Sequence, residues 1–435
     1  MNPHISRRHF LRTMAAAGTA ATAAARPFSH LLHAEALPVP ASTGIEHIIV
    51  VMMENRSFDH FLGWLPGANG RQAGLTYHDK QNQPHQTYHL TTFQGCQFAD
   101  PDHSYGGARI QYDNGKCDGW LKAGTNDLFP IGYYEQGDLS FLSHAAPQWT
   151  TCSDYFAAIL GPTYPNRLYQ HAAQTDRLDD STTISTLPTI WDRLAAAGLN
   201  GRYYYNDIPF TALWGARYLN ISRPYAEFLA GCAAGALPNV SFVDPRFEDE
   251  TSGTSNDDHP HADIRNGEAF LNQLYQAVTT SPAWANTVLV INFDEWGGFF
   301  DHVPPPLKPI PPADKAVGSD GRIGFRVPSL VISPFARRSY VATTQFDHTS
   351  VLRMIEWRWS LDPLTVRDAT ANNLAKVLDF ERPNLYAPQY AVPPGPFGGV
   401  CASAAIGSTV PAADSEETEW SAIQALAVKY GFPIY

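Results

Sequence analysis

Cysteine, positive charge and long apolar stretches are all scarce in this chain of 435 residues. It holds only five cysteines, and no two of them have the spacing of a zinc knuckle, which argues against a structural zinc site. Lys and Arg number 30 against 42 acidic residues, so the formal net charge is −12. That charge argues against binding nucleic acid or an anionic membrane through bulk electrostatics. Beyond the N-terminal segment no apolar run has the length of a transmembrane helix, so we expect no integral membrane segment in the mature protein.

The few cysteines leave their pairing open. In an exported protein, Cys96 and Cys117 could form a local loop staple. Folding in a reducing cytoplasm before export would weaken that expectation. The other three are Cys152, Cys232 and Cys401.

The first 36 residues resemble a twin-arginine export signal. Arg7 and Arg8 precede a weakly apolar, alanine-rich run over residues 14–25, and residues 33–36 offer a small-residue cleavage site. We therefore expect the twin-arginine export machinery as a partner and a periplasmic or secreted location. No charge run, repeat or low-complexity linker divides residues 37–435, so the sequence predicts a single domain there.

One apolar run ends in two polar side chains. Residues 48–53 show no polar alternation, which is typical of a strand buried on both faces, and Glu54 and Asn55 follow at once. Open α/β sheets bind their ligands at the carboxyl ends of the strands. The alternative for these residues is a plain core strand followed by a solvated loop.

A second apolar run repeats the pattern. Residues 287–293 lead into Asp294 and Glu295, which two glycines follow closely. Adjacent carboxylates at a buried strand end are costly unless a cation neutralises them. We expect this pair to converge with Glu54 and Asn55 on one divalent ion, and an all-oxygen ligand set favours Ca²⁺, Mg²⁺ or Mn²⁺ over zinc.

A third segment offers a nucleophile. Thr163 lies between an apolar run and a helical pattern that begins at Leu168, so we expect it at or just before a helix N-terminus, where a phosphate-like anion is favoured. The alternative is an ordinary N-cap threonine. Asn166 and Arg167 beside it would donate to phosphoryl oxygens of a substrate.

These segments together resemble the bacterial phosphoesterase family that contains phosphatidylcholine-type phospholipases C and acid phosphatases. The resemblance implies an α/β class with an alkaline-phosphatase-like, mostly parallel sheet sandwiched by helices. It also implies hydrolysis of phosphate esters at a metal-bound hydroxyl, here Thr163, so residues 37–435 would be one phosphoesterase catalytic domain. The strings that carry it, in the order of the family, are residues 54–60 (ENRSFDH), 161–167 (GPTYPNR), 258–260 (DHP), 294–298 (DEWGG) and 301–306 (DHVPPP).

Four histidines are candidates for proton transfer or for donation to phosphate oxygens: His103, His259, His261 and His302. His259 and His261 lie in residues 257–263, where two histidines and three aspartates occupy seven positions. The alternative for that segment is an acidic surface loop that caps a helix beginning near Asp263. His348 reads first as part of the N-cap region of a helix.

The expected reaction is a double displacement through a phospho-threonine, on a small-molecule or lipid phosphate ester. Threonine at position 163 favours the phospholipase C type, and we expect phosphodiesters to be preferred over phosphomonoesters. A broad acid phosphatase is the alternative, and a non-catalytic exported metal- or carbohydrate-binding protein is a more remote one. Near the C-terminus we expect a helix over residues 416–430 that packs on the core through Trp420, Ile423, Leu426 and Val428.

Overall fold

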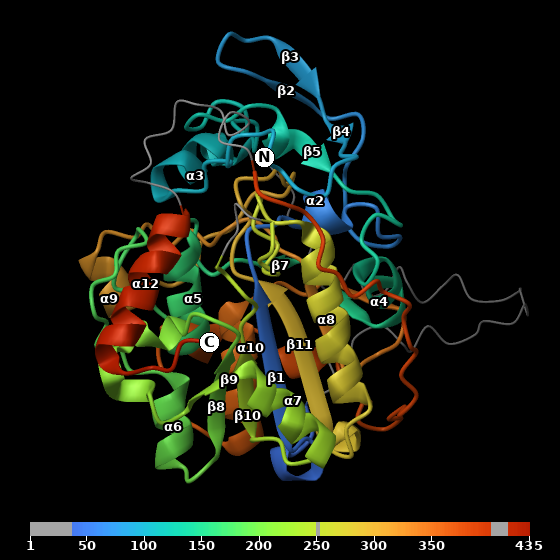
Figure 1. The fold of residues 1–435 in the computed structure, drawn as a ribbon, viewed down its shortest axis with the longest axis vertical. Coiled ribbons are helices and arrows are strands. Elements are labelled where there is room, and N and C mark those ends of the chain that lie inside the picture. The colour runs from blue at the N-terminus through green and yellow to red at the C-terminus, as the bar shows by residue number, and fades with distance from the viewer. Residues whose placement is uncertain (1–36, 249–252, 402–415) are drawn as a thin grey trace, which may run out of the picture. The chain divides into compact units, whose positions relative to one another are not determined.

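The computed structural model describes residues 37–248, 253–401 and 416–435, and Pro38–Tyr435 form one compact unit (Figure 1). The predicted export signal lies outside the described residues. Among the residues that are described, no helix combines the length and the apolar character needed to cross a bilayer.

An eight-stranded sheet forms the centre of this unit. One strand, β12, runs antiparallel to both of its neighbours, and the other pairings within the sheet are parallel. The predicted mostly parallel sheet is thus confirmed. From edge to edge the strands are β13 (Tyr340–Ala342), β6 (Thr150–Cys152), β12 (Ser329–Ile332), β11 (Thr287–Phe293), β1 (His47–Met53), β10 (Val240–Val243), β8 (Gly201–Tyr205) and β9 (Ser222–Pro224).

Three small two-stranded sheets accompany the large one. They pair β2 (Thr76–His78) with β3 (Pro84–Gln86), β4 (Tyr88–His89) with β5 (Gly132–Tyr133), and β7 (Tyr155–Phe156) with β14 (Phe346–Asp347).

Helices cover both faces of the large sheet (Figure 1). On one face α7 packs against α8, and on the other α10 packs against α5. Helix α11 also contacts α10. The described α-helices are α2 (Phe58–Leu62), α3 (Tyr105–Tyr112), α4 (Leu142–Gln148), α5 (Thr163–Ala172), α6 (Ile190–Ala196), α7 (Tyr225–Ala234), α8 (Ile264–Thr279), α9 (Pro312–Ala316), α10 (His348–Trp359), α11 (Val366–Thr370) and α12 (Glu416–Tyr430). The described 3-10 turns are η1 (Pro40–Ser42), η2 (Asp113–Gly115), η3 (Phe129–Ile131), η4 (Phe210–Tyr218), η6 (Trp284–Asn286) and η7 (Leu374–Val377).

The two central strands are the two apolar runs found in the sequence. β1 and β11 are parallel neighbours, with Met53 opposite Phe293, and their branched side chains are buried. Burying one such side chain stabilises the fold by about 1.5–3 kcal/mol, so this register is strongly favoured. The amide of Asp294 donates to the carbonyl of Met53 at 3.0 Å, which continues the pairing past the strand ends. The polar side chains that follow both strands therefore meet at one edge of the sheet, as predicted.

Helix α5 begins earlier than the sequence pattern indicates. Thr163 is its first residue and Pro162 is the N-cap, with no side-chain cap bond, so the N-cap alternative for Thr163 is wrong. Pro165 fits within this first turn because the first amides of a helix have no partner inside it.

The structure corrects two expectations outside the site. Cys96 is bonded to Cys401 across a sequence separation of 305, while Cys117 is a buried free thiol, so a Cys96–Cys117 staple is wrong. On α12, Trp420 and Ile423 are buried as expected. Val428, however, is 64% exposed and does not pack on the core.

Candidate active site

The hydroxyl of Thr163 meets the end of β1. Its Oγ1 lies 3.4 Å from Glu54 Oε1 and 3.4 Å from Asn55 Oδ1, and all three side chains are buried. The structure thus brings together the predicted nucleophile and two of its predicted partners, although 109 positions separate Glu54 from Thr163 in the chain.

The turns after β1 and β11 are built against each other. Asn55 has a φ of 58°, a left-handed conformation that asparagine tolerates, and its amide donates to Asp294 Oδ1 at 3.1 Å. Gly297, with a φ of 61°, comes so close that a Cβ there would lie 2.0 Å from the carbonyl oxygen of Asn55. Only glycine fits this contact, which sets the distance between the two acidic turns.

Arg167 is held by carboxylates in this structure. Its Nε donates to Asp294 Oδ2 at 2.9 Å, and its NH1 lies 3.4 Å from Asp244 Oδ1. Burial lowers the pKa of the guanidinium, but the nearby carboxylates, Asp294 first, raise it overall above its ordinary value. The sequence pattern missed Asp244, which follows β10 directly, and direct binding of phosphate by Arg167 stays a prediction.

Asn166 shapes the loop in front of Thr163. Its Nδ2 donates to the carbonyls of Gly161 at 2.8 Å and Pro162 at 3.0 Å, and its Oδ1 accepts from the amide of Ile159 at 3.0 Å. The side chain is buried. We therefore assign Asn166 to positioning of the nucleophile loop, whereas the sequence suggested a direct contact with substrate.

Three buried carboxylates gather at this site. Glu54, Asp294 and Glu295 are fully buried, and Asp294 pairs with Arg167, which Asp244 shares. Carboxylate oxygens are the donors that a hard divalent ion prefers. The predicted ligand set therefore fits a divalent ion, although Glu295 Oε2 accepts from the amide of Gly297 at 2.8 Å, within its own turn.

Two loops carry the predicted histidines to this edge. The amide of Glu54 donates to the carbonyl of Asp257 at 2.8 Å, so the segment before His259 lies beside the end of β1. A Cβ on Gly298 would lie 2.7 Å from Pro101 Cβ, so the segment before His103 packs on the turn after β11.

Hydrogen bonds distinguish the protonation of the histidines. His103 Nδ1 lies 2.8 Å from the carbonyl of Pro101, so Nδ1 carries a proton and donates it in this bond. His259 has the opposite tautomer, because its Nδ1 accepts from the amide of His261 at 3.2 Å and its Nε2 lies 3.4 Å from Asp100 Oδ2. The Nε2 of His261 lies 3.2 Å from the carbonyl of Phe98.

The segment over residues 257–263 is buried and is no surface loop. Asp257, Asp258 and His259 are at most 2% exposed, and Asp263 caps α8 by accepting from the amide of Arg265. Burial raises the pKa of Asp257 to about 6 and that of Asp258 well above its ordinary value. The surface alternative for this segment is therefore wrong, whereas the cap near Asp263 is confirmed.

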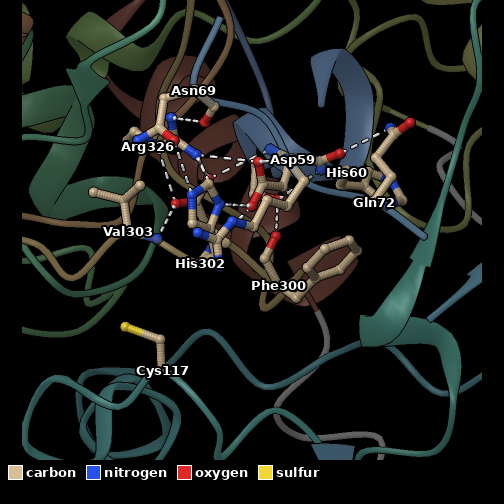
Figure 2. Close-up of polar contacts among 12 residues, drawn as sticks. Asp59, His60, Asn69, Gln72, Cys117, Phe300, His302, Val303 and Arg326 are labelled. Atoms are coloured by element: carbon tan, nitrogen blue, oxygen red, sulfur yellow. Dashed lines mark hydrogen bonds and ion pairs between the residues drawn. The ribbon is translucent and has the colours of Figure 1, made fainter. Parts of the chain in front are cut away.

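His302 belongs to a different cluster (Figure 2). Its Nδ1 lies 2.5 Å from Asp59 Oδ2, and its Nε2 lies 3.2 Å from Asn69 Oδ1. Arg326 donates to both oxygens of Asp301 at 3.0 Å and to Asp59 Oδ1 at 3.1 Å. The sequence grouped His302 with the catalytic histidines, but its imidazole contacts an ion-pair cluster that α2 and the segment before β12 build.

This cluster, too, has the residue types of a metal site. Asp59, Asp301 and His302 bring one ligand atom each within 4.8 Å of one another, so they are compatible with a divalent ion. Arg326, however, is fully buried between the two carboxylates and already supplies a positive charge. The group around Thr163 brings buried carboxylates, an amide oxygen and a hydroxyl together, and this all-oxygen set is the better fit to a hard divalent ion.

His348 supports the site from behind, a role that the sequence did not indicate. Its Nε2 lies 2.7 Å from the carbonyl of Asp294, and its Nδ1 lies 3.3 Å from the hydroxyl of Tyr155. Burial lowers the pKa of His348 to about 4, so the ring is neutral, donates through Nε2 and accepts from Tyr155. It thereby fixes the main chain of a predicted ligand.

Comparisons with known proteins identify the family of this chain. Residues 45–362 match the family model described as the Phosphoesterase family, so the chain belongs to that family, and it is a hydrolase that acts on phosphoric esters. The resemblance inferred from the sequence is confirmed.

The relatives of this chain include proteins named phospholipases C. Non-specific phospholipase C1 of Arabidopsis thaliana is 32% identical over 377 residues, which cover 76% of this chain and 70% of the relative. Phospholipase C B of Mycobacterium tuberculosis is 32% identical over 461 aligned positions, and the match covers 87% of this chain and 86% of the relative. Among solved structures, a protein in the alkaline phosphatase superfamily from Vibrio parahaemolyticus matches with 13% identity and a TM-score of 0.36, over 77% of this chain and 76% of that one.

Proposed function

We propose that this chain is an exported, metal-dependent phosphoesterase of phospholipase C type that works through a phospho-threonine at Thr163. One observation carries the proposal: a threonine hydroxyl at the first residue of α5 lies 3.4 Å from both Glu54 and Asn55, at the carboxyl end of β1. The phospholipase C names of the relatives support a phosphodiester substrate with a lipid or glyceryl leaving group.

Thr163 reacts as its alkoxide. In the first step its Oγ1 attacks phosphorus, the bond from phosphorus to the leaving oxygen breaks in line, and the leaving oxygen takes a proton from His103. The N-terminal end of α5 favours the phosphate charge at this position. In the second step water attacks the phospho-threonine, the phosphorus–Oγ1 bond breaks, and the Thr163 alkoxide is restored. Two in-line displacements give net retention of configuration at phosphorus.

The hydrogen bonds suggest separate roles for the histidines. His103 is anchored through Nδ1, so its Nε2 can gain and lose a proton without breaking that bond, as a general acid for the leaving oxygen requires. The proton that the attacking water loses then returns to His103. A second proton on His259 would have to bind Nδ1, where it would break the hydrogen bond from the amide of His261. We therefore assign His259 as a neutral donor to phosphoryl oxygens.

Glu54, Asn55, Thr163 and Asp294 would hold the divalent ion, with Glu295 beside them. When bound, it would lower the pKa of the threonine hydroxyl and neutralise phosphoryl oxygens. The ion-pair network of Arg167 keeps Asp294 in place whether or not the ion is bound.

The test is a comparison of catalytic efficiencies on a matched soluble phosphodiester and phosphomonoester and on dispersed phosphatidylcholine, at roughly pH 5–8, where an unperturbed histidine titrates. We expect the diester to be preferred. A clear preference for the monoester, strongest at acid pH, would indicate the acid phosphatase alternative instead.

The nucleophile is tested with variants of Thr163. Thr163→Ala should lose turnover, Thr163→Ser should keep measurable activity, and mass spectrometry should find the phosphoryl group on residue 163. Thr211→Ala is a matched control, because Thr211 is equally buried but bonds Ser222 at the start of β9. Near-normal activity of Thr163→Ala would exclude the mechanism.

Export rests on Arg7 and Arg8, which lie outside the described residues. The disulfide between Cys96 and Cys401 supports a final location in an oxidising compartment. Replacing both arginines with lysine should trap the precursor in the cytoplasm, and unchanged export would contradict the twin-arginine interpretation.

A further inference from the structure

A pocket of about 610 Å³ lies beside α3 and has no part in the proposed chemistry. Its volume is in the range of small-molecule sites. The lining comes from α3, from η2 and the residues after it, and from the segment before β12: Arg109, Ile110, Tyr112, Asp113, Asn114, Gly119, Lys122, Asp320 and Arg322.

Both carboxylates in the lining have a partner of opposite charge. Asp113 Oδ2 lies 2.7 Å from the ammonium of Lys116, and Asp320 Oδ1 lies 3.0 Å from Arg109 NH2. The bond to Lys116 is the main cause that lowers the pKa of Asp113, and Lys122 adds a smaller electrostatic contribution from beyond ion-pair distance.

Two cations of the lining, Lys122 and Arg322, have no carboxylate within ion-pair distance among the described residues. Lys116 and Asp118 lie near each other beside the pocket. With these two included, the charged groups are four cations (Arg109, Lys116, Lys122 and Arg322) and three carboxylates (Asp113, Asp118 and Asp320). In a chain with a net charge of −12, a concave site with excess positive charge attracts anions.

The guanidinium of Arg322 is held in place before any ligand arrives. Its NH1 donates to the carbonyl of Pro305 at 2.7 Å, and it lies 4.1 Å from the ring centroid of Tyr112. An arginine fixed in this way loses little conformational entropy when it binds an oxyanion.

The pocket also adjoins the loop that precedes the nucleophile. Arg109 NH1 donates to the carbonyl of Leu160 at 2.8 Å, and the amide of Leu160 donates to the carbonyl of Arg322 at 3.0 Å. Leu160 stands three positions before Thr163, so two residues of the pocket wall hold the base of the nucleophile loop.

We propose that this pocket is a second anion-binding site, which takes a phosphate group through Lys122 and Arg322. The arginine fork matches a phosphate edge and the lysine adds a point charge. The phosphate can be free inorganic phosphate or the headgroup of an anionic lipid. The proposal does not rest on catalysis at Thr163, because its readout is binding.

The test compares wild-type protein with Lys122→Gln/Arg322→Gln. Inorganic phosphate is titrated by calorimetry, and binding to phosphatidylcholine vesicles is measured with and without phosphatidylglycerol. Phosphate at the reaction centre is followed separately, as competitive inhibition of diester hydrolysis. We expect the double variant to lose at least tenfold in affinity for phosphate at one calorimetric site, for the anionic vesicles, or for both. Weaker binding of free phosphate identifies inorganic phosphate as the ligand, and weaker binding of the vesicles identifies a lipid headgroup.

Lys376→Gln/Arg382→Gln is the matched control, because it also removes one lysine and one arginine charge. Arg382 is 85% exposed. Equal affinities of both double variants for phosphate and for anionic vesicles would overturn the proposal. If Arg322→Gln does not fold, Lys122→Glu alone gives the same test. The Lys122 ammonium has no carboxylate within ion-pair distance among the described residues, so the substitution breaks no ion pair. If the wild-type protein binds phosphate through Lys122 and Arg322 but hydrolyses no diester, the result counts against the proposed function and leaves this site standing.

Discussion

Replacing Arg326 with methionine should destabilise the fold strongly, because it leaves two buried carboxylates without their cation. Asp59 and Asp301 are fully buried, and Arg326 donates to Asp301 at 3.0 Å and to Asp59 at 3.1 Å. Figure 2 shows Arg326 beside Asp59. Its NH1 also donates to the carbonyls of Asn69 at 2.8 Å and Ser153 at 3.1 Å. Methionine has a similar length and can fill the space, so the change is mainly one of charge and hydrogen bonding.

The expected size follows from what is known of buried ion pairs. Removing one partner of such a pair typically costs about 3–5 kcal/mol, because the other charge stays buried. A domain has a total stability of about 5–15 kcal/mol, so the variant should still fold but unfold at a much lower urea concentration.

The pH dependence gives a second check. Burial raises the pKa of Asp301 to about 6 even though Arg326 opposes the shift, so removing Arg326 should raise it further. An acid whose pKa is raised by folding contributes stability at low pH, and this stability is lost as the pH rises through the folded pKa. The deficit of the variant should therefore be smaller at pH 5 than at pH 8.

The assay is urea unfolding followed by tryptophan fluorescence at both pH values. Arg382→Met is the control, because Arg382 is 85% exposed and pairs with Asp379 at 3.2 Å, so its loss should change stability by less than about 0.5 kcal/mol. A deficit of the Arg326 variant below about 1 kcal/mol at pH 8, or one that does not shrink at pH 5, would refute this assignment.

Three further predictions concern other parts of the chain. Glu54→Gln should lower both the content of divalent metal, measured by elemental analysis, and diester hydrolysis by more than about tenfold, and stoichiometric metal in the variant would exclude Glu54 as a ligand. Cys96→Ser should lower stability by about 2–4 kcal/mol in thermal melts, because the bond to Cys401 closes a long loop, and reductant should lower the wild type to match. Burial and the neighbouring Asp368 raise the pKa of Glu356 to about 10, so its contribution to stability is lost as the pH rises toward that value. Glu356→Gln should thus gain in stability relative to wild type from pH 5 to 9, whereas a constant difference would show that Glu356 ionises normally.

The sequence alone determined the parts of this protein that depend on neighbouring residues. Branched apolar runs predicted β1 and β11. The position of the polar residues after each run predicted that their side chains meet, because the ends of parallel strands lie at one edge of the sheet. The short strings around Glu54, Thr163 and Asp294 were enough to identify the family.

The tertiary structure alone decided which charges pair. Arg167 meets Asp294 across 127 positions and Arg326 meets Asp59 across 267, and no local pattern indicates such partners. The same holds for Cys96 and Cys401, which lie 305 positions apart in the chain and come together only in the folded structure. Local periodicity reports burial and helix or strand type, whereas ion pairs and disulfides depend on how distant segments pack, so the roles of His302, His348 and Arg167 became visible only in three dimensions.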